Sequence, residues 1–140
     1  MDKRLTHGFL FALLFLWQLP QNIVALAIMP FLGKLRKVEY RNCCLGLAGE
    51  RFPARASGIS LGSFAFFHPD KARDEFTIRH EMDGHTVDSK IFGPLYLLIS
   101  GIPPILHILF MKKGGRYYDF YTERWANLHA GIKDGEWDFN

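Results

Sequence analysis

The sequence lacks the features that mark proteins binding nucleic acids or nucleotides. Its net charge is only +3 over 140 residues, and no basic run is interleaved with aromatic residues. Its glycines do not have the spacing of a phosphate-binding loop. We therefore expect neither a nucleic-acid partner nor a nucleotide.

Cysteine is also scarce. The two cysteines, Cys43 and Cys44, are neighbours, and a disulfide between neighbours is strained because the Cα atoms of a bridge normally lie further apart. They also lack the paired spacing of a structural zinc site. We interpret them as small buried thiols. The length fits a single domain over residues 1–140, without internal repeats.

Charge is absent from one long stretch, residues 8–32. This stretch is long enough to cross the hydrocarbon core of a bilayer as a helix, and no A-x-A-like cleavage site follows it. We therefore predict a transmembrane helix over 8–32. A second apolar block, residues 91–111, is interrupted by Gly93-Pro94 and by Pro103-Pro104, which predicts a broken or re-entrant membrane segment.

Cations flank both apolar blocks, as expected where a chain meets lipid headgroups. They are Lys3, Arg4, Lys34, Arg36, Lys37, Lys112 and Lys113. The predicted partner is accordingly the lipid bilayer.

A polar cluster lies in the middle of the first apolar block: Gln18, Gln21 and Asn22, with Pro20 among them. Pro20 should kink the helix, because proline has no backbone N–H. Two interpretations of the amides remain open. They either hold helices together by hydrogen bonds or line a polar space beside an active site.

The remaining segments predict an α+β membrane protein. Residues 38–67 are rich in β-formers bounded by Gly and Pro and predict strands of a small sheet. Residues 74–90 predict a polar helix that carries the sharpest motif and leads into the second apolar block. Residues 117–131 predict a C-terminal helix.

The motif is His80-Glu81-Met82-Asp83-Gly84-His85. A zinc peptidase places two histidines four residues apart on one helix face, and the glutamate after the first acts as general base. Here the histidines are five apart, so in a regular α-helix they would diverge by about 140°.

Three arrangements would still allow a metal site. A π-bulge would absorb the extra residue. Alternatively, the helix could end at Gly84, so that His85 approaches from a turn. In the third, the ligands are Glu81, His85 and Asp88, which share one face of a regular helix.

A second pattern lies in the C-terminal helix, where Glu123, Ala126 and Asn127 match E-x-x-A-D/N. This pattern resembles the helix of gluzincin metallopeptidases. In that class a glutamate supplies the third zinc ligand, and an Asp or Asn four positions later steadies the first histidine. The resemblance implies that the zinc ligands are His80, His85 and Glu123 and that the catalytic base is Glu81. It also implies that Asn127 orients a ligand histidine.

A wider resemblance covers most of the chain. HEMDGHTVDSKIFGPLYLLISGIP followed by YYDFYTERWAN resembles a family of small bacterial membrane proteins with the pattern H-E-x-G-H…G-P-L-Y-L…G-I-P…Y-T-E-x-W-A. This chain differs by the extra residue in the motif and by Asp88, where the family usually has Gln. Asp88 is either an additional ligand or without a role.

These observations predict a membrane-bound zinc metallopeptidase of the bacterial cytoplasmic membrane, which hydrolyses a peptide bond through a Glu-activated water. The substrate would be a peptide or a membrane-proximal segment, paired with the strand Gly58–Phe67. The alternative is a non-catalytic membrane protein, either an inactive peptidase relative or a partner-binding subunit. The other histidines, His129 among them, are interpreted as polar or packing residues.

Overall fold

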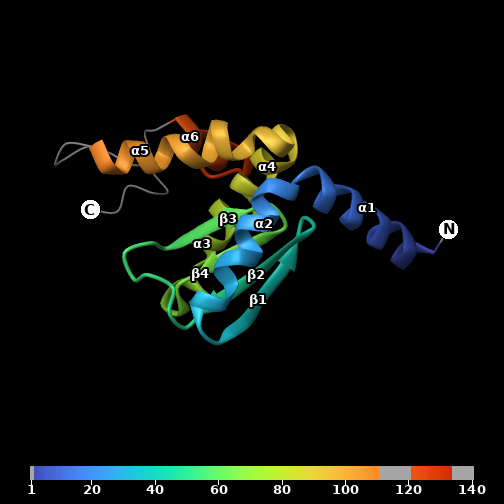
Figure 1. Cartoon of the computed structure of the whole chain (residues 1–140), viewed down its shortest axis with the longest axis horizontal. Helices are drawn as coiled ribbons and strands as arrows, with labels where there is room; N and C mark the ends of the chain where they lie inside the picture. The colour runs from blue at the N-terminus through green and yellow to red at the C-terminus, as the bar shows by residue number, and fades with distance from the viewer. Residues whose placement is uncertain (1, 111–120, 134–140) are drawn as a thin grey trace.

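The computed structural model describes residues 2–110 and 121–133 and has an α+β fold with a small mixed sheet (Figure 1). The strands are β1 (Leu35–Arg41), β2 (Cys44–Gly49), β3 (Gly58–Leu61) and β4 (Phe64–Phe67). Their order in the sheet is β1-β2-β4-β3. The pairs β1–β2 and β3–β4 are antiparallel, whereas β2–β4 is parallel.

The strands form two hairpins, β1–β2 and β3–β4. The first turns at Asn42 and Cys43, which both have positive φ, 53° and 54°, and Arg41 pairs with Cys44 across the turn. Two successive positive φ values are typical of the type I′ turn, whose twist matches that of the flanking strands. The second hairpin turns at Gly62, with φ of 65°. The sheet over 38–67 therefore has four strands.

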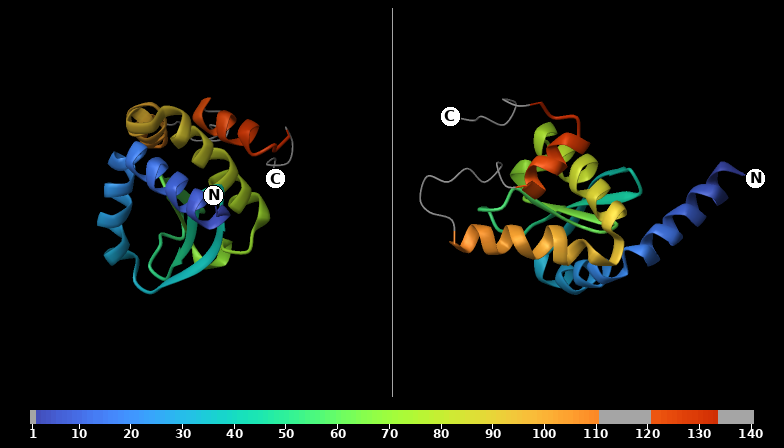
Figure 2. Two further views of the ribbon diagram at one scale, coloured as in Figure 1. Left: turned by 90° about the vertical axis from the view of Figure 1, so that its right-hand side faces the viewer. Right: turned by 90° about the horizontal axis from the view of Figure 1, so that it is seen from above.

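Two apolar clusters fill the two faces of the sheet. One lies under helix α2 (Leu19–Ile28) and contains Ala25, Leu61 and Phe66. The other lies under the motif helix and contains Phe67, Ile78 and Met82. Figure 2 (left) shows the resulting layers, with α2 on one side of the sheet and the motif helix with α6 (Tyr121–His129) on the other.

The first apolar block forms two helices where the sequence predicted one. They are α1 (Lys3–Trp17) and α2, which a short 3-10 turn, η1 (Met29–Leu32), extends. The segments Lys3–Trp17 and Leu19–Leu32 are bent by 89°. The bend follows from Pro20, which has no backbone N–H to donate to Leu16 O. The amides beside it bind carbonyls of α1, since Gln18 Nε2 donates to Leu14 O and Asn22 Nδ2 to Phe15 O.

By length and composition, the bent pair of α1 and α2 together could span a membrane. Among the described residues, no individual helix is long and apolar enough to do so.

The polar cluster of the first block is fully buried and joins the layers. Gln21 Nε2 donates to Ser89 Oγ (3.0 Å) and to Gly93 O (2.8 Å), while Ser89 Oγ donates to Gln18 Oε1 (2.6 Å). Asn22 Oδ1 accepts from the backbone N–H of Ser63 (2.7 Å) in the β3–β4 turn. Of the two interpretations of these amides, the structure therefore shows the packing role.

The motif helix and the second apolar block form one interrupted run. Its segments are α3 (Glu75–Arg79), η3 (His80–His85, a π-helix), α4 (Thr86–Phe92), η4 (Gly93–Leu95), η5 (Leu97–Gly101, a π-helix) and α5 (Ile102–Phe110). The run breaks at Gly93, whose φ is 51°. A Cβ there would lie 2.2 Å from the Trp17 ring, so glycine lets α1 meet this corner.

Helix α6 lies against the π-helix η3 (Figure 2). It is also tied to the second apolar block, because Tyr121 Oη donates to Ile99 O (2.7 Å). The expected C-terminal helix began at residue 117. Its residues 117–120 lie outside the described part of the chain, as does residue 111 at the end of the second apolar block.

Candidate metal centre

The histidine motif forms a π-helical turn, η3, between α3 and α4. A π-helix makes i→i+5 hydrogen bonds, so one turn holds one residue more than an α-helical turn needs. The five-residue spacing therefore brings both histidines to one side of the helix. Their ring centroids lie 4.7 Å apart, with the ring planes at 87°. Of the three arrangements left open by the sequence, the structure shows the π-bulge.

Neighbouring elements hold this turn in place. Glu81 O accepts from Thr86 Oγ1 (2.9 Å) and from Ser60 Oγ (2.9 Å). Asp83, on the outer side of the turn, is bound by Arg41 Nη1 (2.8 Å) and Asn42 Nδ2 (2.7 Å) of the β1–β2 hairpin. Both partners come from parts of the chain far from the motif, so the local sequence does not reveal them.

Gly84 sets the distance between the π turn and α6. A Cβ on this residue would lie 2.3 Å from the backbone oxygen of Ala126, which is closer than real contacts allow. Glycine therefore lets the two helices touch. As a result, three residues from two successive turns of α6 reach the centre: Glu123, Asn127 and His129.

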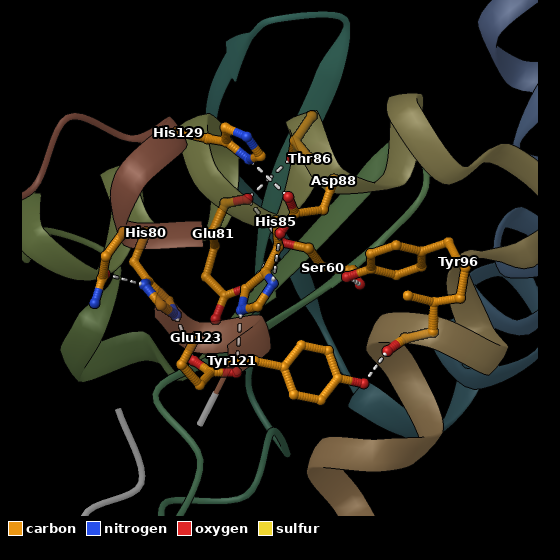
Figure 3. Close-up of polar contacts among 12 residues, drawn as sticks. Ser60, His80, Glu81, His85, Thr86, Asp88, Tyr96, Tyr121, Glu123 and His129 are labelled. Carbon is orange, nitrogen blue, oxygen red and sulfur yellow. Dashed lines mark hydrogen bonds and ion pairs between the residues drawn. The ribbon is translucent and has the colours of Figure 1, made fainter. Parts of the chain in front are cut away.

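Glu123 lies between the two imidazoles (Figure 3). Its Oε2 is 2.8 Å from His80 Nε2, and its Oε1 is 3.4 Å from His85 Nε2. All three side chains are buried. Two ligand atoms of a tetrahedral zinc ion lie about 3.3–3.4 Å apart, because each is about 2.0–2.1 Å from the metal. The distance between His85 and Glu123 equals this spacing, whereas the 2.8 Å between His80 and Glu123 is that of a hydrogen bond.

Glu81 belongs to the same cluster. His80, Glu81 and His85 form a buried group whose donor atoms all lie within 4.8 Å of one another, and such a group can hold a metal ion. The centre therefore offers two imidazoles and two carboxylates. Nitrogen and oxygen donors of this kind suit zinc. Glu81 Oε2 also accepts a hydrogen bond from Ser60 Oγ (2.7 Å), which fixes its carboxylate beside β3.

A different polar residue stands behind each histidine. His80 Nδ1 donates to Asn127 Oδ1 (2.7 Å), and Nε2 on the other side of the ring faces Glu123. Asp88 Oδ2 lies 3.7 Å from His85 Nδ1, and its Oδ1 lies 2.7 Å from His129 Nδ1. Asp88 thus faces the ring nitrogen opposite to the one that faces Glu123. Asp88 therefore lies on the side of His85 that faces away from Glu123. The structure does not show the third arrangement, in which Glu81, His85 and Asp88 are the ligands.

The buried charges shift each other's titration. Burial disfavours charged His85, but the carboxylates of Glu123, Glu81 and Asp88 outweigh it and raise the pKa of His85 to about 9. Burial likewise raises the pKa of Glu123, but His85 and His80 outweigh it and hold that pKa well below its ordinary value. The pKa of Asp88 is raised, because its burial outweighs the two nearby histidines. Without a metal, the centre is an ion-pair network.

Two contributors were missed by the analysis of the sequence. Ser60 comes from a strand, and only the tertiary fold brings it to Glu81. His129 follows Glu123 by six residues, which places it about 120° away around α6, so helical spacing gave no reason to group them.

Comparison with protein-family models, with curated proteins and with solved structures finds no match to this chain.

Proposed function

We propose that this chain is a membrane-bound zinc metallopeptidase that hydrolyses a peptide bond in a peptide or membrane-proximal segment. The observation that carries the proposal is the π-helical turn, which brings His80 and His85 together on the carboxylate of Glu123. A helix with an extra residue in its motif would otherwise separate the histidines. The resemblance to bacterial membrane proteins with a zinc-peptidase-like pattern points to the same activity.

In this proposal His80, His85 and Glu123 hold the zinc ion, and Asn127 orients His80. Zinc, when bound, polarises a substrate carbonyl and lowers the pKa of a bound water to about 7. Glu81 takes the proton from the attacking water and returns it to the leaving amine. Its position supports this role, because the carboxylate lies beside both imidazoles and Ser60 fixes its orientation.

The edge of the sheet supports a peptide substrate. β3 is an edge strand, whereas β4 is enclosed between β2 and β3. Of the stretch Gly58–Phe67, only Gly58–Leu61 therefore lies at an edge, where an added strand would have to replace the bond from Tyr96 Oη to Ser60 O (3.4 Å). Extended peptides bind such edges through main-chain hydrogen bonds. Because Ser60 of β3 contacts Glu81, a segment paired there would lie next to the proposed base.

We place the protein in the bacterial cytoplasmic membrane, as a multi-segment or re-entrant membrane protein. The uncharged stretch of residues 8–32, the apolar block that begins at residue 91 and the flanking cations support this location.

The test is the zinc content of the detergent-purified chain compared with His85→Ala and Glu123→Ala. We expect near-stoichiometric zinc in the wild type and its loss in both variants. Glu75→Ala is the matched control, because Glu75 is an exposed carboxylate of α3 just before the motif and should leave zinc unchanged. Glu81→Gln should keep zinc but abolish peptide hydrolysis, which separates metal binding from catalysis.

The second candidate is a non-catalytic membrane protein, an inactive relative or a partner-binding subunit. One observation favours it: Glu123 already pairs with both imidazoles, so the buried charges balance without a metal. If the wild type contains no metal and both alanine variants fold normally, the second candidate is established and the peptidase is excluded.

A further inference from the structure

Helix α2 has its polarity reversed relative to a helix of a water-soluble domain. Its buried residues are Gln21, Asn22 and Ala25. Its outward side chains are Leu19, Ile23, Val24 and Leu26, and Phe31 follows on η1 with 76% of its surface exposed. Soluble helices show the opposite arrangement, with the apolar stripe facing the core. The outward side chains of α2 are therefore suited to contact an apolar environment.

The second apolar block repeats this reversal. Tyr96 and Ser100 face inward and are buried. The large outward side chains of η5 and α5 are all aliphatic or aromatic: Leu98, Ile102, Ile105, Leu106, Leu109 and Phe110. Ile102, Leu106 and Leu109 have i, i+4, i+7 spacing and form one stripe, as do Leu19, Ile23 and Leu26 on α2.

These two stripes lie on the same side of the molecule. Leu97 of η5 packs against the apolar cluster to which Ala25 of α2 belongs, so both segments border the same cluster. Figures 1 and 2 show α2 and α5 on the side of the sheet away from α6, and they run across each other. We call this surface the apolar face; its members are Leu19, Ile23, Val24, Leu26, Phe31, Leu98, Ile102, Ile105, Leu106 and Leu109. An exposed apolar surface of this extent marks an interaction site.

We propose that the apolar face seats the protein in one leaflet of a phospholipid bilayer, with α2 and α5 lying in the membrane plane. The inference deepens the membrane attachment proposed above and is independent of the metal. The segment Leu19–Leu32 has 14 residues, from 10 in α2 and 4 in η1, and spans about 21 Å, short of the roughly 30 Å hydrocarbon core. Helices that run across each other cannot both follow the membrane normal, whereas both can lie in its plane.

Charge complementarity favours lipid over a second copy of the chain. The apolar face carries no ionisable side chain, and exposed Lys34, Arg36 and Lys37 follow directly where η1 ends. Cations at the border of an apolar surface bind anionic headgroups, and their long stems can remain over the acyl region. The described amides of α2 already hydrogen-bond inside the protein, so this face meets lipid without exposing them.

The test is a depth measurement on the full-length chain in vesicles of phosphatidylcholine and phosphatidylglycerol. Single cysteines replace Leu19, Ile23 and Leu26, and in a second set Ile102, Leu106 and Leu109. Each carries a fluorescent label whose quenching by spin labels at two acyl-chain depths is compared. The wild type is the labelling blank, because Cys43 and Cys44 are buried.

We expect equal, shallow depths within each set. A helix that crosses the bilayer would instead show a gradient of about 10 Å over the seven residues from Leu19 to Leu26, which would overturn the proposal. Labels that lipid does not quench would also overturn it, and cross-linking between chains in that case would identify a second copy as the occupant. A label in place of Glu75, an exposed residue of α3 on the other side of the sheet, is the control that should stay in water.

A paired substitution tests the same face without labels. Ile23→Glu with Leu106→Glu should reduce the fraction of protein that floats with the vesicles at least tenfold, because a carboxylate is costly in the acyl region. Leu128→Glu is the control, since Leu128 is also an exposed leucine but lies on α6, on the other side of the sheet. Equal loss in the control would contradict the proposal. Zinc content should be the same in all three proteins.

Discussion

At the scale of single residues, the two histidines of the candidate metal centre differ in the residue that faces the outer ring nitrogen. Asn127 accepts from His80 Nδ1, whereas the buried carboxylate of Asp88 faces His85 Nδ1, with His129 beyond it. A carboxylate behind a ligand histidine fixes the ring orientation and increases its basicity. Asp88, which the sequence placed on one helix face with His85, thus lies behind that histidine.

We predict that Asp88→Asn lowers the zinc affinity about 10- to 100-fold, because the amide keeps the shape of the side chain but loses the negative charge behind His85. The measurement is a zinc titration in competition with a chromogenic chelator. Asp70→Asn, which changes an exposed carboxylate away from the centre, is the control. An unchanged affinity in Asp88→Asn would show that the 3.7 Å approach to His85 has no influence on the metal.

Ser60 holds the proposed base in a comparable way. We predict that Ser60→Ala lowers peptide hydrolysis about tenfold at unchanged zinc content, because Glu81 loses a charge-assisted hydrogen bond. Ser60→Thr keeps the hydroxyl and should restore most of the rate. Rates on an internally quenched peptide, with metal content measured in parallel, decide the matter. Loss of zinc in Ser60→Ala would assign Ser60 to the fold of the centre instead.

At the scale of elements, the π turn η3 can be understood as an α-helical turn with one residue inserted. Asp83 is the residue to remove, because its side chain points to the β1–β2 hairpin and Met82 is buried in the core. We predict that deletion of Asp83 gives a regular helix with histidines four apart and retains zinc. The fold should be less stable, since the contacts with Arg41 and Asn42 are lost.

Metal analysis and thermal unfolding of the deletion variant test this prediction. The control is the insertion of an alanine after Asp83, which separates the histidines by six residues and should abolish zinc binding. If the deletion also loses zinc, the π turn itself is required, beyond its effect on spacing.

The contact between η3 and α6 gives a second prediction at this scale. Gly84→Ala places a methyl group 2.3 Å from Ala126 O, so α6 must move and carry Glu123 and Asn127 with it. We expect at least a tenfold loss of zinc affinity and a lower unfolding temperature. Gly8→Ala is the control, because a Cβ at Gly8 meets nothing within 4 Å and alanine favours the helix. Equal zinc affinity would mean that α6 adjusts without moving Glu123.

At the scale of the whole molecule, the amides of α2 connect the apolar face with the rest of the fold. Asn22 accepts from Ser63 N–H and donates to Phe15 O. We predict that Asn22→Leu destabilises the protein by about 2–4 kcal/mol, because two buried backbone groups lose their partner. Denaturant unfolding in detergent measures the change. Leu26→Ala, on the outward side of the same helix, should have little effect, and a similar loss there would contradict this assignment.

The sequence was sufficient for the parts of the molecule that depend on local pattern. The α+β class, the two apolar blocks and the broken course of the second block follow from residue types and from Gly93-Pro94. The grouping of His80, His85 and Glu123 was predicted, and the structure brings them together, although their role as ligands stays a prediction. The resemblance contributed Glu123 and Asn127, which helical spacing alone would not have singled out.

Long-range contacts explain what the sequence did not reveal. Ser60 and His129 reach the centre through the sheet and through α6, and nothing next to them in the sequence indicates this. The 89° bend between α1 and α2 is accompanied by hydrogen bonds from Gln18 and Asn22 to carbonyls of α1, whereas Pro20 alone predicted only a kink. The parallel pairing of β2 with β4 depends on a crossover connection that no local signal fixes.

The π turn has a consequence for how such proteins are found. A search pattern that requires two histidines four residues apart passes over this chain, although the centroids of its two imidazoles lie 4.7 Å apart. In evolution, gain or loss of one residue in this helix need not destroy the centre, because a single turn absorbs the change. Metal sites on helices are therefore better defined by the side of the helix that their ligands share than by a fixed count of residues between them.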